Sequence, residues 1–384
     1  PVAVLANLVI VPALFVLTVV SFVFLSLNLI GAVFCLGWMG IVLSQLTRAT
    51  FYINHLFAVV PLSYIRIPAP SPFFISAYYA FLAYILFTKK RKYIPIVALA
   101  LLNIFIWSQD LSHGGKQLKI TFLDVGKGDS LVVQFPALGT MLIDGGSGGV
   151  EGMSDAGKSV VAPYLWNNDI RKLDLVVVTH FHEDHLGGLF YILENFKVGC
   201  VIDNGEPSSA DMALYEKYTG IIKKNRIRRI VVSDGDEITG FGRAKIFVLN
   251  PVRDAGDVDP NDSSIVLKII YNDFSALLCG DISSTAMEHV MTYGELLRSD
   301  IIKIPHHGGN VGDRRVVKRF LDLVSPQVSV TSSGGRYRSS RISRDTQELI
   351  DSFDSVNYGT KREGAIIIAS DGAHFKVTPF RKNN

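Results

Sequence analysis

The first part of the chain alternates between long apolar runs and short polar breaks. No charged residue occurs in residues 1–47. A span needs about 20 apolar residues, so this run accommodates two membrane-spanning helices, which we expect at residues 4–27 and 30–46. Two shorter apolar runs follow at residues 73–87 and 93–107. Residues 49–66 mix aromatic and polar side chains, which indicates a helix lying in the membrane interface.

A different pattern begins near residue 117. Short β-branched and aromatic runs, bounded by glycine-rich turns, predict strands at residues 118–122, 130–135, 140–143, 173–178, 230–232, 244–249, 265–270 and 275–278. A helix is expected at residues 187–195. This alternation of strands and helices predicts a layered α/β domain.

The change of composition along the 384 residues predicts two domains. We expect an α-helical transmembrane region at residues 1–110, including the interfacial helix near residues 49–66, and an α/β domain at residues 111–384. The chain starts with Pro1 and lacks a basic leading region, so we expect it to be a piece of a longer protein. The net charge of +3 does not by itself indicate a nucleic-acid partner.

Residues 89–92, which are Lys, Lys, Arg and Lys, predict the topology. Positive residues in short loops stay on the cytoplasmic side of a membrane. One more crossing after this cluster places the second domain outside the cytoplasm. The sequence therefore predicts a multi-pass membrane protein with an extracytoplasmic second domain.

Candidate metal ligands crowd one loop at the end of the strand expected at residues 173–178. His180, His182, Asp184 and His185 lie within six positions, followed by Gly187 and Gly188. Three imidazoles and a carboxylate in one tight loop indicate a divalent metal site. Zinc fits these ligands, and sites with carboxylates and open positions also accept manganese, so the ligand types leave both metals open.

This loop resembles the H-x-H-x-D-H signature of the metallo-β-lactamase superfamily, and the other motifs follow in the family's order. The segment from Leu142 to Gly146 resembles its first motif, and Leu278 to Asp281 resembles the motif whose aspartate bridges two metals. Lys303 to Gly309 is similar to its last histidine motif. The resemblance implies a metallo-β-lactamase fold, an αββα sandwich, in the second domain.

Two features narrow the resemblance to the ComEC family of competence proteins that internalise DNA. The segment from Phe122 to Ser130 and the late Pro-His-His-Gly sequence resemble that family's motifs. In such proteins a multispanning region precedes a metallo-β-lactamase-like domain, which is the order expected here.

The resemblance implies a role for each matched residue in a site with two divalent metal ions, Zn or Mn. His180 and His182 hold one ion, and Asp184 and His185 hold the other. Asp281 bridges the two ions, and His306 closes the second site, with His307 as the alternative. Asp184 and Asp281 are the expected catalytic residues. Three further aspartates are expected to accept hydrogen bonds from metal-bound imidazoles or to form turns, namely Asp124, Asp129 and Asp144.

The chain departs from the family pattern at three places. His182 stands where many ComEC-like domains carry Asp, so this chain has the fuller hydrolase ligand set. The superfamily's middle histidine is absent, because no histidine occurs between His185 and His289, and Asn261 to Ser264 occupies that stretch. One metal is therefore expected to bind weakly. The late family segment is present only from Ser333 to Arg338, without its histidine.

Several polar residues can contact phosphate through charge or hydroxyl hydrogen bonds, namely Lys127, Ser264, Ser332, Ser333 and Arg336. Basic clusters at residues 223–229, 314–319 and 336–344 can follow a phosphate backbone, although such clusters are commonly solvated helix faces. The soluble half has no aromatic-rich stacking platform, which argues against reading of bases.

These features favour a metal-dependent nuclease of natural transformation, which hydrolyses phosphodiester bonds of incoming DNA while a strand passes through a membrane channel. Its expected partners are DNA, single-stranded or duplex, the membrane, and other DNA-uptake proteins. Two alternatives stay open at this point. One is a DNA transport or binding module with weak or no hydrolase activity, and the other is a metallo-hydrolase of another ester, such as a lactone.

Overall fold

The structure is a computed structural model, and it describes residues 2–30, 36–60, 72–87, 93–98, 100–101, 117–136, 139–149, 154–205, 207–253, 258–333 and 342–381. The chain divides into two compact units, Pro1–Pro68 and Ala69–Asn384. The domain boundary expected at residues 110 and 111 and the basic cluster at residues 89–92 lie outside the described residues. Both stay predictions.

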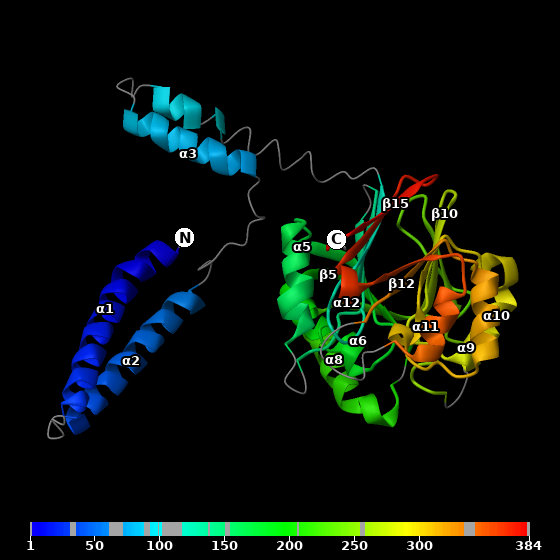
Figure 1. Cartoon of the computed structure of the whole chain (residues 1–384), viewed down its shortest axis with the longest axis horizontal. Helices are drawn as coiled ribbons and strands as arrows, with labels where there is room; N and C mark the ends of the chain where they lie inside the picture. Colours follow the sequence, from blue (N-terminus) through cyan, green and yellow to red (C-terminus); the bar gives the residue numbers. More distant parts are fainter. Residues whose placement is uncertain are drawn as a thin grey trace. The chain divides into compact units, whose positions relative to one another are not determined.

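The first unit contains the helices α1 (Val2–Leu29) and α2 (Leu36–Val59), which lie side by side (Figure 1). The helix α3 (Pro72–Phe87) follows. By length and composition, the stretch Leu5–Leu29 is the one helix among the described residues that can cross a membrane. The second spanning helix and the interfacial helix, expected separately, form the single helix α2. Residues 47–59 contain no Pro or Gly, so nothing in the sequence breaks the helix there.

The α/β domain contains two sheets. The first has eight strands in the order β15-β14-β1-β2-β3-β4-β5-β6. Its strands are β1 (Leu118–Phe122), β2 (Leu131–Phe135), β3 (Gly139–Ile143), β4 (Lys172–Val177), β5 (Lys197–Asp203), β6 (Arg228–Val231), β14 (Ile366–Ser370) and β15 (Phe375–Pro379). The strand β1 pairs antiparallel with β14, which comes from the far end of the chain.

The second sheet has seven strands in the order β13-β12-β11-β10-β9-β8-β7. Its strands are β7 (Glu237–Ile238), β8 (Lys245–Asn250), β9 (Val266–Tyr271), β10 (Phe274–Leu278), β11 (Ile301–Lys303), β12 (Val328–Thr331) and β13 (Val356–Gly359). Its strands β10 to β13 run parallel to one another, as do β3 to β6 of the first sheet. The carboxyl ends of parallel strands meet at one edge of a sheet, so the loops that follow them come together.

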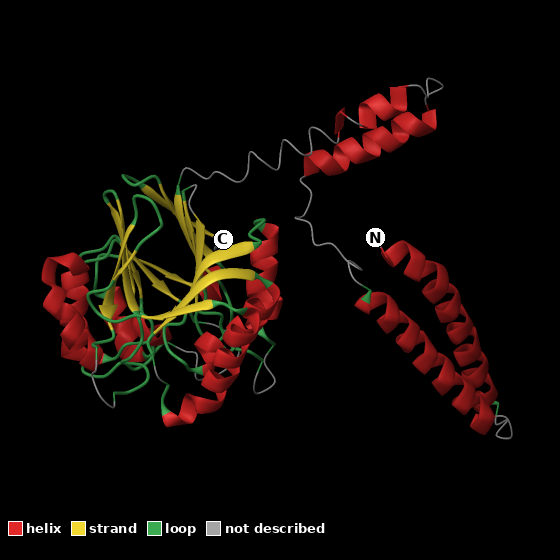
Figure 2. Ribbon diagram, turned by 180° about the vertical axis from the view of Figure 1, so that it is seen from behind, coloured by secondary structure: helices red, strands yellow, loops and turns green. Residues whose placement is uncertain are grey.

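Helices cover the outer face of each sheet, with the two sheets between them (Figure 2). The helical elements beside the first sheet are η3 (Gly157–Val161), α5 (Ala162–Asn167), α6 (Glu183–Leu186), α7 (Leu189–Asn195), η4 (Ser209–Asp211) and α8 (Met212–Asn225). The remaining ones are α9 (Ser284–Val290), η5 (Met291–Leu297), η6 (Pro305–Gly308), α10 (Arg314–Val324), α11 (Arg344–Asp351) and α12 (Thr360–Glu363). The domain is therefore the expected αββα sandwich.

The core between the sheets follows from alternation along the strands. In β2, Leu131 and Val133 point into the inter-sheet core, whereas Val132 packs under the helices of the first sheet. Side chains two residues apart in a strand share a face, which gives each sheet one face for the partner sheet and one for the helices. This packing holds the strand ends rigidly, and the polar loops project from them.

Candidate metal centre

Asp144 organises the loop that follows β4. It comes directly after β3 and is fully buried. Its Oδ1 accepts a hydrogen bond from the backbone N–H of Thr179 at 2.9 Å, and its Oδ2 accepts one from the Thr179 hydroxyl at 2.7 Å. The same Oδ2 lies 2.8 Å from Nδ1 of His185. Asp144 therefore fixes both the start of the histidine loop and the ring of His185, as the sequence predicted for an aspartate beside a metal-bound imidazole.

A tight backbone contact brings Asp129 to the same place. Gly128 has φ +99°, and a Cβ atom on it would lie 1.7 Å from the carbonyl oxygen of Asp184. Only glycine fits this approach. The neighbouring N–H of Asp129 donates to the same carbonyl oxygen at 3.3 Å. The loop between β1 and β2 is thereby packed against the histidine loop.

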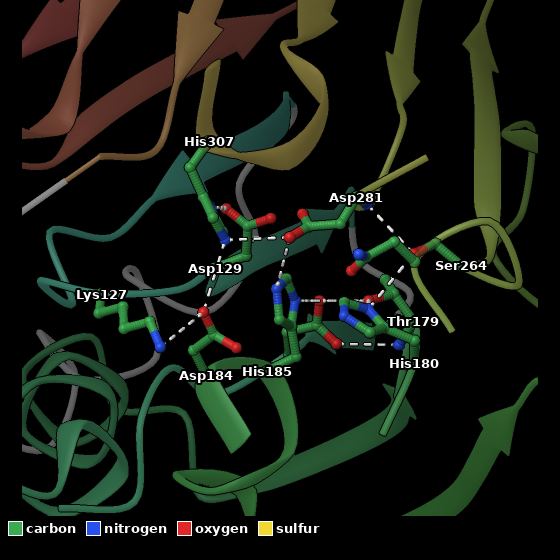
Figure 3. Close-up of polar contacts among 12 residues, drawn as sticks. Lys127, Asp129, Thr179, His180, Asp184, His185, Ser264, Asp281 and His307 are labelled. Atoms are coloured by element: carbon green, nitrogen blue, oxygen red, sulfur yellow. Dashed lines mark hydrogen bonds and ion pairs between the residues drawn. The ribbon is translucent and has the colours of Figure 1, made fainter. Parts of the chain in front are cut away.

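Four buried or nearly buried residues gather at this point, namely Asp129, His185, Asp281 and His307, with ligand atoms within 4.8 Å of one another (Figure 3). The Nε2 atoms of His185 and His307 lie 3.2 and 3.1 Å from Oδ2 of Asp281. The Nε2 atom of His307 also lies 3.9 Å from Oδ2 of Asp184. The loops after β4, β10 and β11 thus bring together two imidazoles, His185 and His307, and two carboxylates, Asp184 and Asp281.

Asp129 lies close to this point, but its carboxylate oxygens contact Lys303 and His307. Its Oδ2 forms an ion pair with Lys303, and its Oδ1 faces Nδ1 of His307 at 3.4 Å. Both of its oxygens are therefore directed at neighbours that hold the site together. The side chains that can hold an ion here are Asp184, His185, Asp281 and His307, and Asp129 orients His307.

Electrostatics tie these groups together. Burial alone would lower the pKa of His185, but the charges of Asp281 and Asp144 outweigh it and raise the pKa well above its usual range. Burial would raise the pKa of Asp281, but His307, His185 and Lys303 hold that pKa well below its usual range. Asp281 and Asp129 likewise raise the pKa of His307, against its burial, to about 9. In the folded chain the two imidazoles hold protons whose positive charge balances Asp281. A bound divalent cation can replace these protons and balance the same charge.

An unpaired buried nitrogen supports a metal ion. Among the described residues, Nε2 of His180 is buried without a hydrogen bond, whereas the ring nitrogens of His307 face Asp129 at 3.4 Å and Asp281 at 3.1 Å. Buried polar atoms normally have partners, and a missing partner often marks an ion. Burial and the charge of His185 lower the pKa of His180 well below its usual range, so this ring is neutral and has a free lone pair. The residues present fit divalent metal ligation.

His180 and His182 form a less complete part of the site. Nδ1 of His180 lies 3.1 Å from the Thr179 hydroxyl and 3.3 Å from the Ser264 hydroxyl. The His182 side chain is one-third exposed, and its Nε2 lies 3.9 Å from Oδ2 of Asp211. The two rings are 4.6 Å apart. The ring of His185 lies 4.1 Å from that of His180, but its Nδ1 and Nε2 face Asp144 and Asp281.

The neighbours His306 and His307 are separated by backbone conformation. Both have left-handed φ, 49° and 54°, which is uncommon for residues other than glycine. This turn directs His307 toward Asp281 and leaves His306 in the cavity wall, with the two ring centres 6.2 Å apart. Of the two residues that the sequence offered to close the second site, the structure brings His307 into the cluster.

A cavity of about 410 Å³ opens onto the cluster. Its wall includes Lys127, His182, Asp184, Asn261, Asp281, His306, His307, Ser332 and Ser333. Lys127 lies 3.7 Å from Oδ2 of Asp184. The Ser332 hydroxyl is buried without a hydrogen-bond partner. Three of the five residues expected at phosphate, Lys127, Ser332 and Ser333, thus line this cavity.

The other expected residues lie elsewhere. Ser264 is fully buried beneath the site, where its hydroxyl accepts a hydrogen bond from the N–H of Asp281 at 3.1 Å. It positions His180 and Asp281 and does not line the cavity. Asp124 lies 3.8 Å from Arg381 and contacts none of the clustered residues in the part of the chain that the structure describes. Arg336 lies outside the described residues.

Sequence reasoning gave no role to Lys303, Asp211 or Glu183. Oε1 of Glu183 accepts hydrogen bonds from the Ser147 hydroxyl and the N–H of Gly148, which fixes the loop after β3. Lys303 carried a usable signal, because a single lysine directly follows the apolar pair Ile301 and Ile302. Charged residues are almost never fully buried unless they are paired.

Comparison with known proteins agrees with this geometry. Residues 123–325 match the family model of the metallo-beta-lactamase superfamily. The chain is 28% identical over 239 residues to ComE operon protein 3 of Bacillus subtilis (strain 168), covering 57% of this chain and 29% of that protein. It is 27% identical over 216 residues to competence protein ComA of Neisseria gonorrhoeae, covering 56% of this chain and 27% of that protein. The chain thus spans less than one-third of the length of either relative.

Solved structures of metallo-hydrolases are also similar. The hydrolase Igni18 of Ignicoccus hospitalis is 16% identical with a TM-score of 0.43, over 65% of this chain and 98% of that one. The metallo-beta-lactamase fold protein YhfI of Bacillus subtilis is 13% identical with a TM-score of 0.42, over 66% of this chain and 100% of that one. By the family match, the chain belongs to the metallo-beta-lactamase superfamily, and within it the chain is similar to the two DNA-competence relatives of the ComEC type.

Proposed function

We propose that this chain is a membrane-anchored, metal-dependent phosphodiesterase of DNA uptake. The observation that carries the proposal is the cluster of Asp129, His185, Asp281 and His307, with Asp184 3.9 Å from His307, beside an open cavity that Asp184, Asp281 and His307 line. One of the chain's relatives is named competence protein ComA and the other ComE operon protein 3, which supports DNA as the substrate. In this proposal the domain hydrolyses incoming DNA while a strand passes through a membrane channel to which other DNA-uptake proteins contribute.

The site residues divide the work of hydrolysis. Asp184, His185, Asp281 and His307 would hold one divalent ion, zinc or manganese, and His180 and His182 would hold the second. Bound divalent ions supply Lewis acidity, which makes water nucleophilic at neutral pH and balances charge on a phosphoryl group. Lys127 supplies a positive charge at the cavity wall for a phosphate oxygen, and the unpaired Ser332 hydroxyl offers a hydrogen bond.

The cavity favours a phosphate backbone over bases as the recognised part. Its described lining residues include no Phe, Tyr or Trp on which a base can stack. Some charges of the basic clusters are paired within the domain, since Arg229 pairs with Asp203 at 2.5 Å and Lys318 pairs with Asp322 at 2.9 Å. Arg314 likewise lies 3.1 Å from Glu348. We therefore expect cleavage that depends weakly on base sequence.

The apolar stretch Leu5–Leu29 and the competence relatives indicate membrane association. A multi-pass topology with the hydrolase domain outside the cytoplasm is part of the proposal. It is supported by the basic cluster at residues 89–92, which the positive-inside rule keeps in the cytoplasm.

The test is cleavage of end-labelled single-stranded DNA by the detergent-solubilised chain, with zinc or manganese added. We expect metal-dependent cleavage that Asp281→Asn reduces by at least about 100-fold, since even residues that only support metal ligands matter by 10- to 100-fold. His289→Ala and Asp322→Asn are matched controls away from the cavity, and both should cleave like the unaltered chain.

One observation favours the alternative of a DNA-binding or transport module with weak hydrolysis. His180 and His182 are not part of the tight His/Asp cluster, and the carboxylate beside His182, Asp211, lies 3.9 Å away, so the second ion is held less completely. If the folded, metal-loaded chain binds DNA but cleaves neither single-stranded nor duplex DNA, this alternative replaces the nuclease. Cleavage of a lactone in place of DNA would instead identify a hydrolase of another ester.

A further inference from the structure

Lys303 is a buried, charged side chain beside the metal centre, and the proposed hydrolysis gives it no role. It ends β11 and is 1% exposed. Its ammonium contacts Oδ2 of Asp129, Oδ1 of Asp281 at 3.2 Å and the carbonyl oxygen of Gly280 at 2.7 Å. A lysine ammonium has three N–H donors, and here each has an acceptor. The position of Nζ is therefore fixed from three sides.

This ammonium divides the oxygens of Asp281 between two tasks. Oδ1 faces Lys303, whereas Oδ2 faces His185 and His307 at 3.2 and 3.1 Å. With Oδ1 engaged, Oδ2 is the atom that Asp281 presents to an ion. Asp129 is divided in the same way, between Lys303 and Nδ1 of His307.

Lys303 also joins the two sheets. It belongs to β11 of the seven-stranded sheet, whereas Asp129 belongs to the loop before β2 of the eight-stranded sheet. Both carboxylates are buried, at 1% and 2% exposure. Two buried negative charges at the junction of two sheets would repel each other and oppose closure of the sandwich without a cation.

We propose that Lys303 is a positioning residue that acts as a built-in counter-ion, so that the centre folds with its carboxylates aligned before any metal binds. Many metal sites rich in acidic ligands depend on the ion for folding. Here the Lys303 ammonium balances the buried carboxylates in place of the ion, and the metal ion binds to carboxylates that are already in position. The role of Lys303 does not depend on which ester the site hydrolyses.

The test compares thermal unfolding of the chain in detergent, with EDTA and with zinc, for Lys303→Met and Lys268→Met. Lys268 is an equally buried lysine of β9, but it donates to the Arg298 carbonyl and the Ser299 hydroxyl instead of to carboxylates. We expect Lys303→Met to lower the Tm in EDTA by roughly 10 °C, since it leaves buried charges unpaired. Zinc should recover much of that loss. For Lys268→Met, zinc should raise the Tm no more than in the unaltered chain.

The double variant Asp129→Asn/Lys303→Met keeps the proposal testable if Lys303→Met fails to fold. Removing one of the two carboxylate charges should restore at least half of the Tm lost in EDTA, or restore folding. An equal loss of Tm with and without zinc for Lys303→Met overturns the proposal. So does a double variant that is no more stable than Lys303→Met.

Discussion

Two pairs of histidines lie beside one cavity, which His182 and His307 line, and they are prepared differently for a metal ion. In the pair His185 and His307, each Nδ1 faces a buried carboxylate, Asp144 at 2.8 Å and Asp129 at 3.4 Å, and each Nε2 faces Asp281. In the pair His180 and His182, the polar neighbours are two hydroxyls at His180 and a carboxylate 3.9 Å from His182.

The difference teaches how the surroundings of a histidine set its affinity for a metal. A carboxylate that accepts one N–H fixes the ring and makes the other nitrogen a stronger ligand. The first pair has this support, and it shares two carboxylate ligands. We therefore expect His185 and His307 to hold an ion more tightly than His180 and His182 do.

The largest expected effect is a loss of metal affinity when one histidine of the tightly binding pair is replaced. His307→Ala should lower the affinity of the tight site by at least about 100-fold, because it removes a ligand from the supported pair. His182→Ala should leave the tightly held ion in place. The measurement is bound metal by elemental analysis after dialysis against a weak chelator. Equal loss of metal from both variants would contradict the comparison, and His289→Ala serves as the control.

A smaller effect is expected from the supporting carboxylates. Asp144→Asn should weaken tight metal binding by about 10- to 100-fold, the usual cost of losing such a partner. Asp211→Asn, beside His182, should change it by much less because Asp211 touches only the weaker pair. Competitive titration with a coloured chelator measures both. If Asp211→Asn costs as much as Asp144→Asn, the two pairs are supported equally and the comparison fails.

The last effect is on stability and not on affinity, and it is a pH dependence of opposite sign in the two pairs, measured by thermal unfolding in EDTA. The pKa of His307 is raised from 6.5 to about 9 in the folded chain. Its contribution is therefore fully present below pH 6.5 and is lost as pH rises through about 9, on the order of 3 kcal/mol. His180 has a lowered pKa, so it destabilises the folded chain as pH falls below 6.5.

Single variants separate these two contributions. His307→Ala should flatten the alkaline limb of the stability profile, and His180→Ala should flatten the acid limb. An alkaline limb that is unchanged in His307→Ala would assign it to another group. His185 is one such group, because the charges of Asp281 and Asp144 outweigh its burial and raise its pKa well above its usual range. Lys268 is not, because burial lowers its pKa to about 8 and makes the folded chain more stable as pH rises above that value.

Much of the α/β domain was predictable because its strands are short β-branched and aromatic runs bounded by glycine-rich turns. Residues 118–122 form β1 as expected, and the strands expected at residues 173–178 and 275–278 correspond to β4 and β10. The histidine loop, Asp144 and Asp281 were predictable because their motifs are contiguous. The strands after β10 were not predicted, since β11 has only three residues and β14 pairs with a strand far away in sequence.

The direction in which individual side chains point could not be predicted from the sequence. The choice between His306 and His307 follows from two left-handed residues in succession, and nothing in Pro-His-His-Gly indicates which ring turns inward. Ser264 was expected at phosphate because a hydroxyl in a motif loop is typical of that role. Its hydroxyl instead points beneath the site, toward His180 and the N–H of Asp281.

The pairing of β14 with β1 has a consequence for synthesis of the protein. The first strand of the domain to leave the ribosome, β1, has its inner side chains Leu118, Ile120 and Phe122 fully buried in the finished domain. One edge of β1 stays open until Ile366–Ser370 has been translated, roughly 250 residues later. An unpaired apolar edge strand is prone to pairing with other chains. Nascent chains of this protein therefore carry an aggregation-prone edge for most of their elongation, and a chaperone that shields β1 would have its greatest effect before residue 366 emerges.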